Sequence, residues 1–214
     1  MAIQRREPTL EPENVVVPRL EAVTGDEFVQ FWSSFYPEDY DERYWDHLKL
    51  GQVLRRSDIE ELMEWKAGAR FQKKAAEVAN LVPLAPLNEL RMQEVATPED
   101  LRSFFDKTGG AVSSGIIWRV MILHIARPTD APIYDKNSWL AWRFLSGGFS
   151  ENDLRLKPTN PDTYFDSFIP FTVRLQSASK VGLEENHFRK VDRSLFEFGR
   201  FLQSRAGRRL AREH

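Results

Sequence analysis

Cysteine is absent from all 214 residues of the chain. Its absence excludes disulfide bonds, cysteine nucleophiles and thiolate zinc sites. An iron–sulfur cluster held by four cysteines of this chain is excluded as well. Histidines do not replace the missing ligands, because His47, His124, His187 and His214 lie at no spacing typical of a metal site. We therefore expect no metal, no iron–sulfur cluster and no other cofactor.

Long apolar runs are also missing. A helix that spans a bilayer needs about 20 mostly apolar residues, and the most apolar stretch, Ile116 to Ala126, is shorter and contains Arg119 and His124. The first 20 residues contain neither the apolar segment nor the small-residue cleavage site of a secretory signal. The sequence therefore predicts a cytoplasmic protein with no membrane partner.

Strand patterns are scarce, and residues 15–17 and 171–175 are the only candidates. Apolar residues make up 42% of the chain and recur mainly at helical spacing. We predict an all-α fold of about eight to ten helices, built around one core or as two lobes that share one. The predicted organisation is a polar N-terminal arm (1–20), a single helical module (21–206) and a basic C-terminal tail (207–214).

Cap and breaker residues predict the ends of the helices. The predicted helix starts are Thr24 or Asp26, Ser57, Thr97 and Asp192. Further helices are predicted at 39–54 and 71–81, and residues 81–90 are expected to form a turn or a short helical piece. The helix that starts at Thr97 should end at Lys107, before a turn at Gly109 and Gly110. Ile169-Pro170 indicates a kink or a break.

Charge and aromatic residues are unevenly distributed. Residues 1–64 contain 15 acidic and seven basic residues, whereas residues 187–214 contain eight basic and three acidic ones. A basic face for a nucleic acid and salt bridges between the two ends of the chain are both compatible with this pattern. Eight aromatic residues lie between Phe28 and Trp45. Their helical spacing favours a buried core, and a base-stacking surface is the alternative.

The segment from Thr108 to Leu145 has three parts. A glycine-rich turn leads into residues 116–126, which are apolar almost all round and therefore predict a central, buried helix. A loop with two prolines follows, and Asp135 begins another helix, whose apolar side is formed by Trp139, Trp142, Phe144 and Leu145. His124 is expected to be a core histidine. By itself, the position of Asp135 favours a simple helix cap.

The order of these parts resembles the helix-hairpin-helix module of the DNA glycosylase superfamily, which includes 8-oxoguanine and adenine glycosylases. Pro132-Ile133-Tyr134-Asp135-Lys136-Asn137 is similar to the Pro-Ile-Leu-Asp-Gly-Asn segment of the adenine-glycosylase branch. The resemblance covers residues 108–145, and the helix-hairpin-helix-like core would span residues 97–146. It implies that Asp135 is the catalytic carboxylate.

The hairpin itself departs from the family pattern Leu-Pro-Gly-Val-Gly-x-Lys/Ser-x-Ala, because it has neither the proline nor the Gly-x-Gly spacing. An insertion in the loop aligns Ser114 with the Lys/Ser position, as in monofunctional members; without it Ile116 stands there. No lysine aligns in either case, so no Schiff-base lyase activity is expected. The resemblance implies that DNA is contacted by Gly109, Gly110, Ser113, Ser114, Lys136 and Asn137.

The glycine-rich turn and the chain as a whole each allow more than one interpretation. The glycine-rich turn is either a phosphate cradle at a helix N-terminus or a plain connection between helices. The chain as a whole is either a glycosylase that removes a damaged or mismatched base or a non-catalytic nucleic-acid- or protein-binding protein on the same scaffold. In a third alternative it is an unrelated helical protein in which Asp135 only caps. A base-sized pocket beside Asp135 would favour the first, and a pocket filled by Trp139 or Trp142 would favour the others.

Overall fold

The computed structural model describes residues 24–37, 41, 44, 47, 48, 51–68, 71–112, 115–179 and 187–213. These residues form helices and no strand, which confirms the all-α prediction. The helices are α1 (Gly25–Ser33), α3 (Arg56–Ala67), α4 (Gln72–Leu81), α5 (Leu84–Met92), α6 (Pro98–Ala111), α7 (Gly115–Ala126), α8 (Lys136–Leu145), η4 (Glu151–Arg155), α9 (Pro161–Thr163), η5 (Tyr164–Phe168), α10 (Ile169–Ala178), α11 (His187–Gln203) and α12 (Arg205–Glu213). The predicted arm, residues 1–20, and the strand candidate at 15–17 lie outside the described residues.

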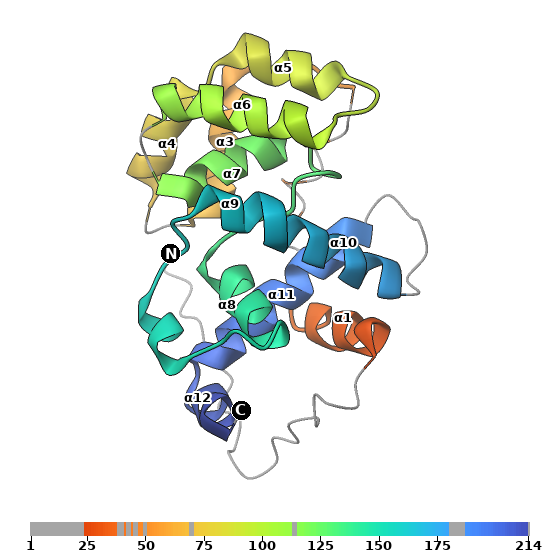
Figure 1. Ribbon diagram of the computed structural model, residues 1–214. Coiled ribbons are helices and arrows are strands. Elements are labelled where there is room, and N and C mark those ends of the chain that lie inside the picture. The colour runs from red at the N-terminus through yellow and green to blue at the C-terminus, as the bar shows by residue number, and fades with distance from the viewer. Residues whose placement is uncertain are drawn as a thin grey trace.

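The helices gather in two groups (Figure 1). In the first group α3 packs on α4 and α7, and α5 and α6 pack on α7. In the second group α11 contacts α1, α8, α10 and α12. One continuous cluster of buried apolar side chains runs through both groups, so they are two lobes with a shared core.

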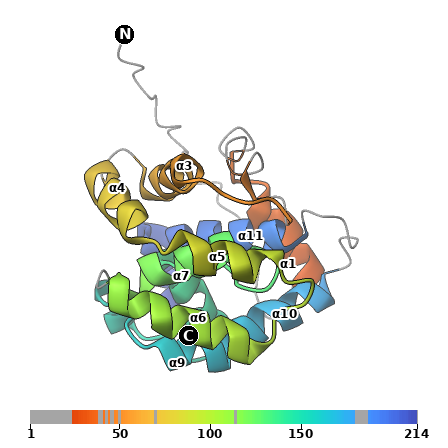
Figure 2. The ribbon, with the colours of Figure 1, turned by 90° about the horizontal axis from the view of Figure 1, so that it is seen from above.

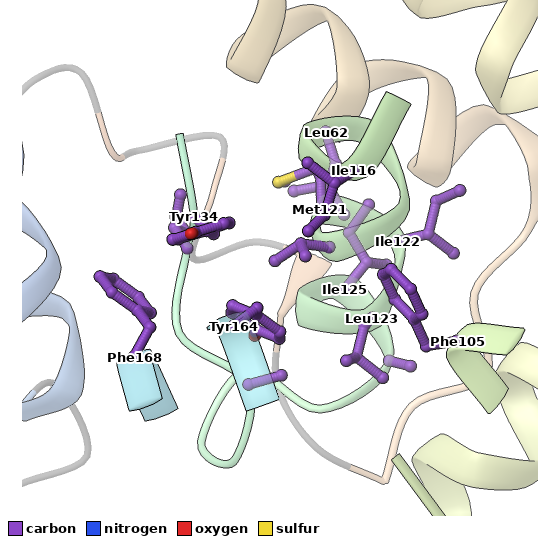
Figure 3. Close-up of a cluster of buried hydrophobic side chains, with 14 of the residues drawn as sticks. Leu62, Phe105, Ile116, Met121, Ile122, Leu123, Ile125, Tyr134, Tyr164 and Phe168 are labelled. Atoms are coloured by element: carbon purple, nitrogen blue, oxygen red, sulfur yellow. The ribbon is translucent and has the colours of Figure 1, made fainter. Parts of the chain in front are cut away.

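Helix α7 lies near the middle of the molecule, as its all-round apolar pattern predicts (Figure 2). Ile117, Trp118 and Arg119 near its N-terminal end are half-buried, and the helix from Val120 to Ala126 is fully buried. Its side chains pack with Leu62 of α3 and Phe105 of α6 (Figure 3). The prediction of a buried core helix is therefore confirmed.

A second part of the core surrounds the loop after α7. The ring of Tyr134 lies 4.7 Å from that of Phe168 and 5.1 Å from that of Tyr164, measured between centroids (Figure 3). The Tyr164 hydroxyl donates a hydrogen bond to the backbone oxygen of Pro132 at 3.0 Å. Aromatic packing and this bond hold the loop in place, although it has no regular secondary structure.

Several predicted helix ends are confirmed by the structure. Thr24 caps α1 and Thr97 caps α6, each through a reciprocal capping box with an acid three residues later. Residues 72–81 form α4, and the 81–90 segment contains most of α5. These predictions depend on cap residues and on helical spacing, which are local signals.

Other predicted ends are wrong. Helix α3 begins at Arg56 rather than after Ser57, and the Asp58 carboxylate accepts a hydrogen bond from the backbone N–H of Arg55 at 2.7 Å. Residues 52–55 are not helical, so the predicted helix 39–54 does not reach Leu54, and much of that segment lies outside the described residues. Helix α11 begins at His187, which places Asp192 inside the helix rather than at its cap.

Two segments are more helical than predicted. Residues 171–175, a strand candidate, belong to α10, and Pro170 does not break the helix. Pro170 lies in the first turn of α10, directly after the π-helix η5, and proline is tolerated at this end of a helix. Residues 205–213, most of which belong to the predicted basic tail, form helix α12.

Candidate functional site

Asp135 stands directly before α8 and caps it. Its Oδ1 accepts hydrogen bonds from the backbone N–H groups of Asn137 and Ser138 at 2.8 and 3.0 Å. The backbone N–H of Asp135 in turn donates to Ser138 Oγ at 2.9 Å. The structure thus confirms that Asp135 begins a helix after an irregular loop.

The second carboxylate oxygen of Asp135 binds a residue that the sequence does not single out. Lys66 Nζ, from the last turn of α3, donates to Asp135 Oδ2 at 2.6 Å, and each side chain is 14% exposed. Burial alone would raise the pKa of Asp135, but the Lys66 charge and the hydrogen bonds from Lys66, Ser138 and Asn137 outweigh it and hold that pKa below its ordinary value. Asp135 is therefore a carboxylate at neutral pH.

A pocket opens beside this ion pair, between the two groups of helices. Its empty volume, open mouth included, is about 430 Å³. The lining residues come from both groups: Tyr36, Trp65, Lys66, Ile133, Asp135, Ser138, Arg189, Asp192 and Phe196. Trp139 and Trp142 are not among them. Three aromatic rings and several charged groups therefore face one space.

Asp192 is the second carboxyl group of the pocket, and it is 3% exposed. Its Oδ1 accepts a hydrogen bond from the backbone N–H of Ile133 at 3.2 Å, whereas its Oδ2 is buried with no hydrogen-bond partner in the described part of the chain. Burial raises the pKa of Asp192 to about 7; the charges of Arg189 and Lys66 lower it and that of Asp135 raises it further. Near neutral pH this group is partly a neutral acid.

Arg189 fixes the aromatic wall of the pocket. Its Nε and Nη2 donate to the two carboxylate oxygens of Asp41, each at 2.8 Å, and Nη2 also donates to the Tyr36 hydroxyl at 2.8 Å. Arg193, one turn later, binds the same carboxylate at 2.7 Å. The Arg189 guanidinium lies about 5 Å from the ring centroid of Trp65. One Asp41 carboxylate therefore holds two guanidiniums, and the group that supports the wall keeps one net positive charge.

The two predicted DNA contacts on α8 are engaged inside the protein. Lys136 Nζ donates to the backbone oxygen of Leu154 at 2.7 Å. Asn137 Oδ1 accepts a hydrogen bond from Gln203 of α11. These side chains could contact a phosphate only if the two bonds break, or through the donors that the bonds leave free. The predicted contacts on the hairpin include Ser113 and Ser114, which lie outside the described residues.

The predicted turn at Gly109 and Gly110 is wrong. Both residues belong to α6, which continues to Ala111, and Val112 N–H still bonds the backbone oxygen of Thr108 at 2.9 Å. The reason is a tertiary contact. The Arg119 guanidinium covers Gly109, where a side chain would clash with the guanidinium. Arg119 also donates a hydrogen bond to the backbone oxygen of Phe105. These glycines therefore do not cradle a phosphate at a helix N-terminus.

His124 is a core histidine, as predicted. Its Nδ1 lies 2.7 Å from the backbone oxygen of Ala131, and its Nε2 lies 2.7 Å from the Tyr44 hydroxyl. Burial lowers the pKa of His124 to about 3, so the ring is neutral. No cluster of metal-ligating side chains occurs within the described ranges.

The N-terminal aromatic residues divide between core and surface. Phe28, Trp32, Tyr36 and Tyr44 are buried, which supports the core interpretation, whereas Phe31 and Phe35 are 41% and 56% exposed. The other two aromatics of this group lie outside the described residues. Among the described members of the group, Tyr36 alone lines the pocket.

The basic C-terminal residues have two different environments. Arg189 and Arg193 bind Asp41, which is a salt bridge between the two ends of the chain. On α12, Arg205, Arg208, Arg209 and Arg212 are exposed. Of these, Arg212 pairs with Glu151 at 2.7 Å. The salt-bridge interpretation of the charge asymmetry therefore holds for Arg189 and Arg193, and a basic face for a nucleic acid stays a prediction for α12.

Comparison with known proteins adds no relative. No protein-family model, curated protein or solved structure matches the chain. Of the helices in the described ranges, none is both long and apolar enough to span a bilayer.

Proposed function

We propose that the protein hydrolyses the N-glycosidic bond of a damaged or mismatched base in DNA, with Asp135 as the carboxylate that assists the reaction. One observation carries the proposal: an ionised, positioned carboxylate lies in the wall of an open pocket that also has aromatic sides. A flat base that has rotated out of the duplex is a ligand of this shape.

The chemistry of base release suits a fixed carboxylate. As the bond between base and sugar breaks, positive charge develops on the sugar, and a carboxylate already oriented toward it stabilises that charge without reorganising. Asp135 has this preorganisation, because two backbone N–H groups and Lys66 fix both of its oxygens. The same oxygens would orient the attacking water.

Lys66 opposes part of this effect, since the ion pair is neutral as a whole. The sugar must therefore approach Asp135 beside Lys66, which lines the same pocket. The role of Lys66 in this scheme is to position Asp135 and to keep it ionised. The aromatic walls formed by Tyr36, Trp65 and Phe196 would stack against the base.

The test is base release from duplexes that each carry one altered or mismatched base, followed by alkali to cleave at abasic sites. We expect release from at least one duplex and a loss of several orders of magnitude in Asp135→Asn. Asp153→Asn is the matched control, because Asp153 is also a buried acid at a helix start and accepts from Ser150 N–H at 2.9 Å, outside the pocket. The control should release base at the parent rate.

The second candidate is a non-catalytic binding protein on the same scaffold. It is favoured by the state of Asp135, whose two oxygens are already occupied by three hydrogen bonds, as in a structural cap. Retention of the parent rate in Asp135→Asn, or no release by the parent from any duplex, would make this the leading function.

A further inference from the structure

We propose that Asp192 is the group by which the pocket recognises its ligand, and that it acts as a neutral carboxylic acid that donates a hydrogen bond to an acceptor nitrogen of a flat heteroaromatic ring. This inference rests on the proposed function and names the class of base that the same pocket takes. It goes beyond Asp135, which the resemblance already implies.

The geometry gives Asp192 one fixed oxygen and one unused oxygen. Oδ1 is held by the backbone N–H of Ile133, itself a lining residue, so the side chain cannot turn freely. Oδ2 has no partner within the described residues, although the residue is 3% exposed. A buried polar atom without a partner destabilises the protein, and a ligand that supplies the partner would relieve that destabilisation.

The surrounding charges do not neutralise Asp192. Arg189 lies one turn earlier on α11, but its charge is committed to Asp41, and the charge of Lys66 is committed to Asp135. Asp135 repels the ionised form from the start of α8. The phenols of Tyr44 and Tyr164 face Asp192 from two further elements, and burial holds the pKa of each above its ordinary value. Burial and the charge of Asp135 outweigh the charges of Arg189 and Lys66 and favour the protonated acid.

The protonation state of Asp192 determines which hydrogen-bonding group the ligand must have. A carboxylate can only accept hydrogen bonds, whereas the neutral acid can donate one. The aromatic walls, Tyr36, Trp65 and Phe196, favour a flat ring. A ring that presents an unprotonated nitrogen fits both requirements. Adenine is a suitable probe, and indole is the matched control, because it is also bicyclic but has no acceptor nitrogen.

The experiment measures the dissociation constants of adenine and indole by ligand-observed NMR between pH 5.5 and 9, on the parent and on Asp192→Asn. If only the neutral acid binds, the apparent dissociation constant of adenine should rise about tenfold per pH unit once most of Asp192 is ionised. Asp192→Asn has an amide donor at every pH and should bind adenine with no pH dependence. Indole should bind more weakly, with no pH dependence.

A second measurement does not depend on the variant. The ¹³C resonance of the Asp192 carboxyl group in the parent should titrate at a higher pH when adenine is bound, because the ligand stabilises the neutral form. Asp153→Asn should leave the adenine dissociation constant unchanged. Circular dichroism and the thermal midpoint check that each variant is folded.

The inference is overturned if the parent binds adenine equally well at every pH, if Asp192→Asn keeps the parent's pH dependence, or if adenine does not bind. Failure of the proposed function gives a different result. In that case adenine binds with the expected pH dependence, but no duplex loses a base. Base release by Asp192→Asn with the parent's pH profile would remove the inference and leave the role of Asp135 intact.

Discussion

Replacement of Asp192 by asparagine should change the pH dependence of stability in a way that reports directly on the buried acid. The pKa of Asp192 is raised from 3.8 to about 7 in the folded protein. Between these two values the unfolded chain has released its proton and the folded protein still holds it. The free energy of unfolding therefore falls as the pH rises from about 4 to about 7, and it is independent of this group above about 7.

The size of the effect follows from the shift. Each pH unit in this window costs about 1.4 kcal/mol, so that the Asp192 carboxylate destabilises the folded protein by up to about 4 kcal/mol at pH 8. Asp192→Asn cannot ionise and keeps an oxygen that can accept from Ile133 N–H. At pH 4.5 we expect the variant to be equal to the parent or about 1–2 kcal/mol less stable, because the buried amide introduces an unpaired donor. At pH 8 it should be the more stable protein.

Urea unfolding followed by far-UV circular dichroism, at constant ionic strength from pH 4 to 9, measures the difference in the free energy of unfolding between Asp192→Asn and the parent. Groups that titrate in both proteins, such as Asp41 and Asp135, largely cancel in the subtraction. Asp153→Asn is the control, since it removes a buried carboxylate that pairs with Arg143 and should be less stable than the parent at neutral pH. A difference for Asp192→Asn that stays constant within about 1 kcal/mol over the whole range would show that Asp192 is hydrated and ionised, and the reasoning would fail.

Three other outcomes are expected. Asp135→Asn should lower the free energy of unfolding by roughly 1–3 kcal/mol at pH 7, because Lys66 loses a charged partner. This loss should shrink as the pH falls and the parent carboxylate is protonated. Equal stability of variant and parent at pH 7 would show that the ion pair contributes nothing. Replacement of the α12 residues Arg205 and Arg208 with glutamine should flatten the log–log salt dependence of duplex DNA binding by about 0.9 for each phosphate that is no longer neutralised, whereas Arg212→Gln, whose charge is paired with Glu151, should not. An unchanged slope in the double variant would mean that these two arginines do not contact DNA. Gly199→Ala should destabilise the protein by about 1–3 kcal/mol or more in thermal unfolding, because its Cβ would overlap the backbone oxygen of Asn137 where α11 crosses α8; a variant as stable as the parent would contradict that close packing.

The features that can be predicted from the sequence are those with local causes. The apolar pattern of α7 requires burial whatever covers it, and Thr97 and Asp135 cap their helices with groups no more than three residues away. The errors have distant causes. Arg119 packs over Gly109 and allows α6 to continue where a glycine pair indicates a turn. No local sequence pattern predicts this interaction.

The residues of the pocket also divide into those that the sequence predicts and those that depend on distant contacts. Asp135 can be found in the sequence because it belongs to a short motif, and its position alone predicts that it caps a helix. Lys66 is 69 positions away from it, on a helix with an ordinary charged surface pattern. Asp192 resembles a cap in the sequence because aspartate is common at helix starts. Its burial, and the pKa that follows from it, depend on where α11 crosses the loop at Ile133.

The ion pairs between Asp41 and the two arginines of α11 also affect the order of folding events. Asp41 and Arg189 are 148 positions apart, so the chain must close a very long loop before the guanidinium can hold Tyr36 in the wall of the pocket. Contacts of such separation form slowly relative to local helices. A chain still on the ribosome has the apolar hairpin of α6 and α7 long before it has α11. The pocket is therefore complete only after synthesis of α11, and a chain truncated before residue 187 would lack three of its lining residues, Arg189, Asp192 and Phe196.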